Sequence, residues 1–218
     1  MQMIKLLAPE AVEKIKEAFR NGAWLDGKET ANGAAKDIKE TIQIHESDTN
    51  FAPLFNQLKG HILNSDAINT TSFPRHIMNM RAMIYTNGGH YDWHVDAPYM
   101  YGFRSDISFT IFLSEPDSYD GGELLFDHGT HKNAFKGKVG DMCVYPTGVL
   151  HKVNPVTSGE RFVLVGWMES FIKDNVDREQ LFMALTEIDR LQKTFKIPSQ
   201  EMDRLNRAIV HMRRTLST

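Results

Sequence analysis

The feature that most constrains this chain is a stretch from Arg75 to Ser170 built of short runs rich in β-branched and aromatic residues. Such runs favour strands, and the turns between them contain Asn, Asp and Gly, which tolerate a positive φ. No helical pattern lies between the runs, so the strands are expected to pair antiparallel in a sandwich or barrel. The runs are HIMNMRAMIYT, DISFTIFLS, GELLFD, KVGDMCVYP and RFVLVGWMES, separated at Asn87-Gly88-Gly89, Asp120-Gly121-Gly122 and Ser158-Gly159.

Helical patterns flank this region on both sides. Apolar residues recur at helical spacing in residues 9–21 and 51–63, and residues 24–47 between them indicate loops around one strand that contains Ile42 and Ile44. After Asp174 two more helices are expected, the second capped by Ser199. The last helix has a narrow apolar stripe of Met202, Leu205, Ile209, Met212 and Leu216. That stripe is expected either to dock on the core or to pair two chains as a homo-oligomer.

The expected fold class is therefore mainly β with flanking helices. A double-stranded β-helix (jelly-roll) core would carry N-terminal helices and a C-terminal helical pair. We divide the chain into an N-terminal support region (1–74), the jelly-roll core (75–173) and the C-terminal helices (174–218). A chain of 218 residues can bury a sufficient core without disulfides.

Composition excludes several classes of protein. A formal charge of −3 gives no electrostatic footprint for nucleic acid or an anionic membrane, so neither partner is expected. The single cysteine, Cys143, fits a reducing compartment and is expected to be a buried apolar side chain in a strand. Lys5, Glu10 and Glu13 interrupt any signal-peptide pattern, and no apolar stretch is long enough to span a membrane. A cytoplasmic protein is expected.

His94-Val95-Asp96 is the first candidate for chemistry. On an extended segment residues i and i+2 point to the same side, so the imidazole and the carboxylate can bind one ion while Val95 points into the core. His151 lies 55 positions after Asp96, in YPTGVLHKVNPV, where a sandwich can bring it opposite this strand. Two imidazoles and one carboxylate on one face of an octahedron are typical of non-haem Fe(II) oxygenases.

Arg161, ten residues after His151, suggests the cosubstrate. A 2-oxo acid can take two open iron positions and leave one for O₂, and its distal carboxylate then needs a partner. The planar guanidinium of arginine binds a carboxylate bidentately and stays charged when buried. Tyr85, nine residues before His94, is expected either to add a hydroxyl hydrogen bond to the cosubstrate or simply to pack in the core.

The remaining aromatic and histidine residues near the motif are less specific. His90, Tyr91 and Trp93 alternate in direction, so only some of them can face the pocket. His128 and His131 have the spacing of a second metal pair, but no third ligand is placed to complete that site, and we expect them to be loop residues.

The sequence resembles the PKHD-type hydroxylases, within the prolyl 4-hydroxylase-like branch of the Fe(II)/2-oxoglutarate dioxygenases. The resemblance spans about residues 1–193 and rests on WLDGKETANGAAKDIKETIQI, YTNGGHYDWHVDAPYM, RSDISFTIFLSEPDSYDGGELLF and GDMCVYPTGVLHKVNPVTSGERFVLVGWMESFIKD. It implies that His94, Asp96 and His151 bind Fe(II), that Arg161 binds 2-oxoglutarate, and that ascorbate keeps the iron reduced. The usual HVDNA is HVDAP here, with Ala97 replacing an amide on the substrate side.

Two alternatives remain open at the level of sequence. A zinc hydrolase could use the same three ligands to activate water, although it would have no need for Arg161. A cupin-like module could bind 2-oxoglutarate without turnover. For an oxygenase, the substrate is expected to be a peptidyl proline or lysine or a small molecule, since no feature of the chain distinguishes these.

Overall fold

The computed structural model describes residues 1–30, 38–195 and 197–217. Asn32 and Gly33 of the predicted loop lie outside the described residues. The helices are α1 (Pro9–Phe19), α2 (Ala52–Leu63), α3 (Asp66–Ser72), α4 (Asn175–Thr194) and α5 (Ser199–Leu216), with short 3-10 turns η1 (Gly27–Thr30) and η3 (Pro116–Ser118). The strands are β1 (Gln2–Lys5), β2 (Leu25–Asp26), β3 (Lys39–Glu40), β4 (Ile42–His45), β5 (Pro74–Tyr85), β6 (His90–His94), β7 (Tyr99–Met100), β8 (Phe103–Arg104), β9 (Ile107–Phe112), β10 (Tyr119–Gly121), β11 (Leu124–Asp127), β12 (Lys132–Phe135), β13 (Asp141–Pro146), β14 (Leu150–Val153), β15 (Val156–Gly159) and β16 (Arg161–Ser170).

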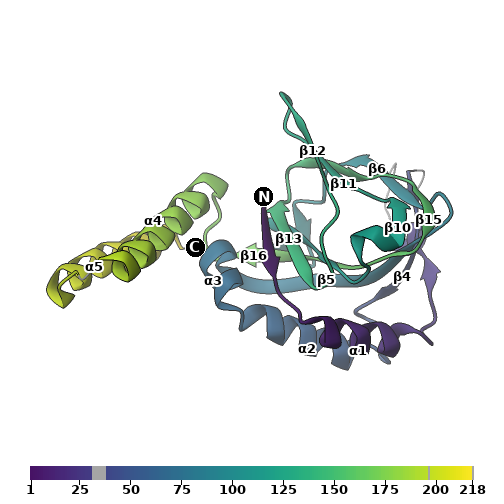
Figure 1. The fold of residues 1–218 in the computed structure, drawn as a ribbon, viewed down its shortest axis with the longest axis horizontal. Coiled ribbons are helices and arrows are strands. Elements are labelled where there is room, and N and C mark those ends of the chain that lie inside the picture. Colours follow the sequence, from purple (N-terminus) through teal and green to yellow (C-terminus); the bar gives the residue numbers. More distant parts are fainter. Residues whose placement is uncertain (31–37, 196, 218) are drawn as a thin grey trace.

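Two antiparallel sheets form a jelly-roll, as the strand pattern predicts (Figure 1). The larger sheet has the order β1-β13-β9-β16-β5-β4-β2, and the smaller has the order β12-β11-β14-β6-β3. Residues of the predicted turns adopt a positive φ, with Gly88 at 88°, Gly121 at 71° and Gly159 at 73°. The chain therefore turns between consecutive strands at the positions where the sequence predicts turns.

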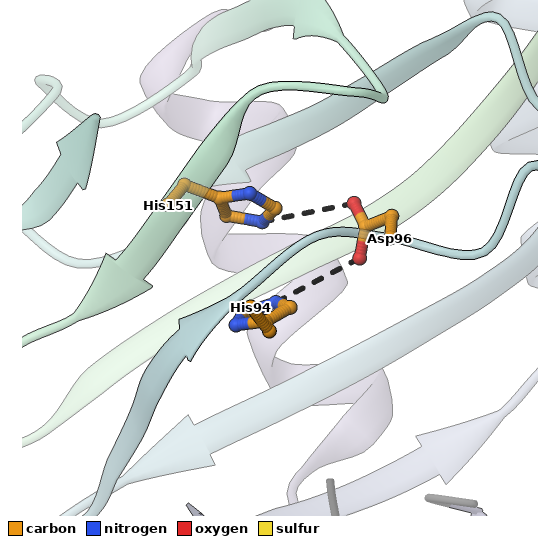
Figure 2. A group of neighbouring side chains, drawn as sticks. All are labelled: His94, Asp96 and His151. Carbon is orange, nitrogen blue, oxygen red and sulfur yellow. Dashed lines mark ion pairs between the residues drawn. The ribbon is translucent and has the colours of Figure 1, made fainter. Parts of the chain in front are cut away.

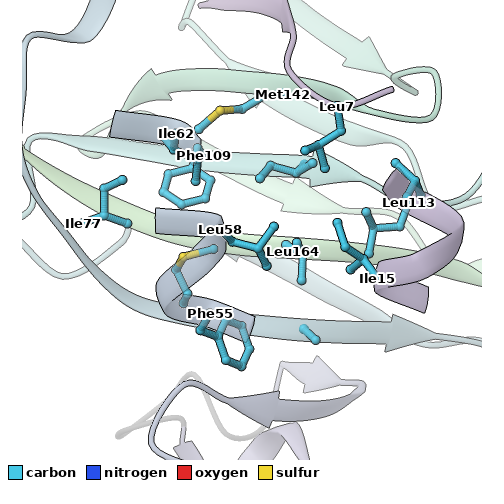
Figure 3. Packing of buried hydrophobic residues seen from close by; sticks show 14 of the residues in the cluster. Leu7, Ile15, Phe55, Leu58, Ile62, Ile77, Phe109, Leu113, Met142 and Leu164 are labelled. Carbon is cyan, nitrogen blue, oxygen red and sulfur yellow. The ribbon is translucent and has the colours of Figure 1, made fainter. Parts of the chain in front are cut away.

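Helices α1 and α2 cover the outer face of the larger sheet (Figure 1). Pro9 occupies the first turn of α1, and the buried faces of these helices pack on strands β9, β5 and β16. Figure 3 shows Ile15 of α1 and Leu58 of α2 beside Leu164 of the sheet. A second apolar cluster lies between the two sheets and includes Met83, Phe126 and Val163. The larger sheet is thus buried on both faces and forms one wall of the space between the sheets.

The C-terminal helices form a hairpin that projects from the jelly-roll (Figure 1). Ile209 of α5 packs with Leu181 of α4 and with Phe73 and Ile172 at the edge of the body. Leu205, in the same predicted stripe, is 40% exposed. The predicted stripe is therefore divided, with part of it packed on α4 and part of it facing outward. Among the described residues, no helix combines the length and apolar character that crossing a membrane requires.

Strand β5 contains a β-bulge at Asn79, which adopts the left-handed conformation with a φ of 57°. Three steps along β5, from Arg81 to Met78, correspond to two steps along β16, from Val165 to Trp167. The backbone N–H groups of Asn79 and Met80 donate to the Glu46 carboxylate at 2.8 and 2.9 Å. These two N–H groups thus have acceptors outside the hydrogen-bond ladder between β5 and β16, which stabilises the bulge.

Candidate active site

The structure brings His94, Asp96 and His151 together between the sheets (Figure 2). His94 ends β6, Asp96 follows it in the connection to β7, and His151 lies on β14 directly opposite His94 in the antiparallel register. One ligand atom from each residue lies within 4.8 Å of the others. Because β6 ends at His94, Val95 is 52% exposed, and the expectation that it points into the core is wrong.

Hydrogen bonds to the backbone fix the orientation of both imidazoles. His94 Nδ1 lies 2.7 Å from the Asp92 carbonyl, and His151 Nδ1 lies 2.9 Å from the Val149 carbonyl. A carbonyl oxygen only accepts, so each Nδ1 carries a proton, and in the neutral tautomer of each ring the lone pair is on Nε2. The Nε2 atoms lie 3.7 and 3.6 Å from the Asp96 carboxylate oxygens, beyond hydrogen-bond reach. Two nitrogen lone pairs and a carboxylate therefore converge on one point.

The surroundings of His94 keep its imidazole in the form that binds metal, and a hydrogen bond positions Asp96. Burial and the neighbouring His151 hold the pKa of His94 below its ordinary value, so this imidazole is neutral at pH 7. The Ser108 hydroxyl donates to Asp96 Oδ2 at 2.7 Å and lies 3.0 Å from Thr147 Oγ1. This bond orients the carboxylate. The donor set and its supporting hydrogen bonds fit an octahedral Fe(II) site with a 2-His-1-carboxylate face.

Two tyrosines contact the imidazoles. The Tyr91 ring stacks on His94 with centroids 3.6 Å apart, so Tyr91 is the member of the His90, Tyr91 and Trp93 group that faces the pocket. Tyr145 is buried, and its hydroxyl lies 3.4 Å from His151 Nε2. Burial raises the pKa of Tyr91 to about 12, which keeps its hydroxyl protonated. Both rings restrict how the histidines can rotate.

Arg161 opens β16 and is 1% exposed, deep in the same pocket. Its Nε and Nη1 have no hydrogen-bond partner within the described part of the chain. Its guanidinium carbon lies 5.0 Å from the centroid of Tyr85, its cross-strand neighbour. Gly122 permits this position, since a Cβ there would lie 3.0 Å from the Arg161 side chain. A buried guanidinium with unused donors is costly unless an anion binds it, so this residue fits a carboxylate ligand.

Tyr85 is buried beside Arg161 and lines the pocket. Its hydroxyl lies 3.9 Å from Met83 Sδ, a weak hydrogen bond that leaves it able to donate more strongly to a ligand. Burial raises the pKa of Tyr85, and the positive charge of Arg161 opposes that rise. The hydroxyl is therefore protonated and able to donate.

Sequence patterns did not single out Ser108 and Tyr145, nor the pocket residues Lys39, Arg81 and Trp167. Arg81 lies on β5 four residues before Tyr85, and Trp167 lies on β16 six residues after Arg161. Strand alternation from those two candidates indicates the same face of the sheet, so the signal was present. Lys39 had no such signal, since its strand β3 has only two residues.

Other candidate histidines lie away from the triad. His90 is half-buried, and its Nδ1 lies 2.9 Å from the Gly88 carbonyl. The Nζ atoms of Lys132 and Lys152 lie 4.9 and 5.2 Å from the centroid of the Trp93 ring. His128 and His131 stack on each other at 4.8 Å, at the end of the β11–β12 hairpin. These four residues lie outside the triad and outside the lining of its pocket.

Comparisons with known proteins agree with this geometry. Residues 80–169 match the model of the 2OG-Fe(II) oxygenase superfamily. A PKHD-type hydroxylase of Rippkaea orientalis is 34% identical over 96% of this chain and 96% of its own length. A PKHD-type hydroxylase of Picosynechococcus sp. is 36% identical over 82% of this chain and 81% of its own.

Solved structures share the fold at lower identity. A Pseudomonas putida prolyl-4-hydroxylase aligns with a TM-score of 0.55 and 19% identity, covering 78% of this chain and 91% of its own. A Trichoplax adhaerens prolyl hydroxylase, solved with a peptide fragment of hypoxia inducible factor, aligns with a TM-score of 0.59 and 14% identity, covering 77% of this chain and 82% of its own. The jelly-roll, the superfamily match and the near full-length relatives together place this chain among the PKHD-type hydroxylases, which are Fe(II)- and 2-oxoglutarate-dependent oxygenases.

Proposed function

We propose that His94, Asp96 and His151 bind Fe(II) in this enzyme and that Arg161 binds the distal carboxylate of 2-oxoglutarate. The observation that supports this proposal most strongly is the protonation pattern of the two histidines. Each Nδ1 donates to a backbone carbonyl, so both Nε2 lone pairs point toward the Asp96 carboxylate. The unpaired Arg161 donors supply the second half of the argument.

Each residue then has a defined task. When bound, iron and 2-oxoglutarate supply the oxygen chemistry that releases succinate and CO₂ and hydroxylates the substrate. Arg161 would orient 2-oxoglutarate by two parallel hydrogen bonds, and Tyr85 would donate a third from the neighbouring strand. Ser108 would hold the Asp96 carboxylate in place by donating to Oδ2.

Of the two alternatives, neither fits as well. A zinc hydrolase would leave Arg161 buried without a ligand, at a cost in folding free energy. Membership of a hydroxylase family favours turnover over a cupin-like module that only binds 2-oxoglutarate. The substrate is a peptidyl proline or lysine or a small molecule, and the family leaves that choice open.

The test is anaerobic reconstitution with Fe(II) and 2-oxoglutarate, followed by exposure to O₂. We expect succinate release, and we expect a matching substrate from a panel of peptides and metabolites to gain the mass of one oxygen atom. Binding of 2-oxoglutarate without succinate release would support the cupin-like module. Hydrolysis with zinc and no response to 2-oxoglutarate would support the hydrolase.

We propose three further properties of the enzyme. Ascorbate would keep the iron reduced, which the family resemblance supports, and omitting it should shorten the linear phase of succinate release. A cytoplasmic location is supported by the single cysteine, Cys143, which is fully buried and has no intramolecular disulfide partner. Residues 1–74, 75–173 and 174–218 would act as support region, catalytic core and C-terminal helices.

We also propose a homo-oligomer formed through the exposed side of α5. Leu205 and Met212 are both 40% exposed and belong to the predicted stripe. The double variant Leu205→Glu/Met212→Glu should then be monomeric by light scattering where the wild type is not. A monomeric wild type at high concentration would refute this proposal.

A further inference from the structure

The active-site pocket extends beyond Arg161 to a second group of hydrogen-bond donors. Arg161 pairs with Tyr85 across the β16–β5 ladder, and four residues further along Val165 pairs with Arg81. At 3.3 Å per residue the two arginines start about 13 Å apart along one wall of the pocket. Both line the pocket that contains the metal triad, so two guanidinium groups from one sheet face the same cavity.

Arg81 is held in place but not saturated. Its guanidinium carbon lies 5.4 Å from the centroid of the Trp167 ring, and Nη2 donates to Asn79 Oδ1 at 3.0 Å. Its Nε has no partner within the described residues. Asn79 is itself fixed by the β-bulge and by Glu46, so Arg81 is positioned before any ligand arrives.

Trp167 supplies a second unused donor in the same wall. It is 7% exposed, and its indole Nε1 also has no partner within the part of the chain that the structure describes. Buried donors without acceptors destabilise a fold, and a purely structural stacking of Arg81 on Trp167 would not require them. Two such donors in one pocket therefore indicate a ligand that accepts hydrogen bonds.

Charge identifies the kind of acceptor. Among the described residues lining the pocket, the cationic side chains are Lys39, Arg81 and Arg161, and the carboxylate is Asp96. In the proposed function, bound Fe(II) would balance the two charges of 2-oxoglutarate, and Asp96 would balance Arg161. Arg81 would then be uncompensated, and so would Lys39 in its protonated form. Lys39 is 2% exposed, and its ammonium donates to Gln43 Oε1 at 3.0 Å, which uses only one of three protons.

We propose that Arg81 and Trp167 bind a carboxylate of the hydroxylated substrate, with Lys39 contributing positive charge from the facing strand. The inference rests on the proposed function, because it assigns 2-oxoglutarate to Arg161 and leaves this subsite for the substrate. The substrate is accordingly an organic acid, an amino acid or a peptide that presents a free carboxylate. A neutral stretch of peptide backbone does not use this positive charge.

The experiment uses ¹⁵N-labelled full-length protein with Zn(II) in place of Fe(II) and saturating 2-oxoglutarate, which prevents turnover and fills the Arg161 subsite. Calorimetry on the same sample first records whether 2-oxoglutarate binds. The probes are N-acetylglycine and N-acetylproline, each paired with its carboxamide, and the α-amide of N-acetylaspartate as a side-chain carboxylate. The readout is the indole N–H resonance of Trp167, with Trp24 and Trp93 as internal controls.

We expect at least one carboxylate probe to shift the Trp167 resonance while its neutral partner does not and the control indoles stay still. A response to N-acetylglycine or N-acetylproline would indicate that the substrate presents a terminal carboxylate. A response to the aspartate derivative would indicate that it presents an acidic side chain. Arg81→Gln should weaken the effective probe about tenfold or more, and Arg81→Lys, which keeps the charge, should lose less. Neither variant should change the affinity for 2-oxoglutarate.

Equal shifts from acids and carboxamides, no shift from any probe, or unchanged binding in a folded Arg81→Gln variant would overturn this inference while leaving the proposed function intact. If Arg81→Gln does not fold, Arg81→Lys with unchanged affinity and unchanged Trp167 shift is the overturning result. Failure of 2-oxoglutarate to bind the wild type in the first calorimetric step would overturn both.

Discussion

The imidazole of His151 lies directly across the β14–β6 strand pair from that of His94, with ring centroids 4.3 Å apart. Backbone pairing therefore sets the separation of the two nitrogen ligands, and the hydrogen bonds from each Nδ1 set their direction. Neither arrangement requires a metal to be bound. The site is preorganised by the sheet, and the fold is expected to survive loss of the ion.

Replacing His94, Asp96 or His151 by Ala should remove Fe(II) binding while leaving the circular dichroism spectrum unchanged. The loss should exceed the roughly 10- to 100-fold expected when a neighbour that orients a ligand is removed. Ser108→Ala is the matched control for that smaller effect, because Ser108 donates to Asp96 without offering a ligand itself. Metal analysis after anaerobic dialysis measures the iron content of the three ligand variants and of Ser108→Ala. Full iron occupancy in two of the three ligand variants would refute the assignment.

Arg161→Ala should reduce the affinity for 2-oxoglutarate and leave iron binding nearly unchanged. Losing one partner of a buried charge pair costs about 2–5 kcal/mol, which corresponds to roughly 30-fold to several thousand-fold in affinity. Arg161→Lys should recover part of the loss, since an ammonium keeps the charge but cannot form two parallel hydrogen bonds. Calorimetric titration into Mn(II)-loaded protein distinguishes the three forms. Equal affinity in all of them would make Arg161 a structural residue.

Lys39→Met should stabilise the protein most at pH 7 and below. Burial, with the nearby charge of Arg81, lowers the pKa of Lys39 from 10.5 to about 7. Below pH 7 the Lys39 ammonium is charged in both the folded and the unfolded protein, so the folded protein bears the full free-energy cost of burying that charge. Between pH 7 and 10.5 the unfolded chain binds more protons, so wild-type stability rises with pH, by at most about 1.4 kcal/mol per pH unit, and the advantage of the variant shrinks.

Urea denaturation at several pH values measures this trend for Lys39→Met and for the control Lys14→Met, whose lysine is exposed. The control should show no comparable pH dependence. A stability difference between wild type and Lys39→Met that stays constant from pH 6 to pH 10 would show that Lys39 does not titrate in this range.

Ile209→Ala should destabilise the C-terminal hairpin by about 2 kcal/mol, because Ile209 is buried against Leu181, Phe73 and Ile172. Leu205→Ala is the control, since this side chain is 40% exposed and its loss should cost under about 0.5 kcal/mol. Hydrogen exchange measures the free energy of opening for amides of the hairpin and of the jelly-roll separately. Equal protection of α4 in both variants would mean that Ile209 does not hold α5 against α4.

Sequence patterns predicted most of the jelly-roll because its strands are short runs rich in β-branched and aromatic residues and its turns contain residues suited to a positive φ. The helices at Pro9 and at Ala52 also followed from apolar spacing. The pattern did not predict α3, since Asp66–Ser72 contains two threonines and three further residues with low helix propensity, Asp66, Asn69 and Ser72. That helix begins where the Ser65 side chain accepts from the Ile68 N–H, a local cap that apolar spacing does not register.

The metal triad was predictable because its members lie in a short motif and at a strand position with recognisable spacing. The second donor group follows the same strand alternation as Tyr85 and Arg161, but no local motif marks Arg81 and Trp167 as side chains that bind a ligand. Lys39 is joined to the site by pairing between distant segments, with Lys39 opposite Tyr91, and no local pattern in the sequence encodes that contact.

The bulge at Asn79 reverses the alternation of β5. Before it, Ile77 faces the helices, and after it Met80, Ala82 and Ile84 do, which leaves Arg81 facing the pocket. Deleting Asn79 would restore regular pairing and leave both faces as they are, because Ile77, Met80 and Ala82 would still alternate toward the helices, but it would remove the amide oxygen that accepts from Arg81 Nη2. In a relative of this enzyme that lacks the bulge, an arginine at this position would therefore still face the pocket, but its guanidinium would lose the contact that orients it.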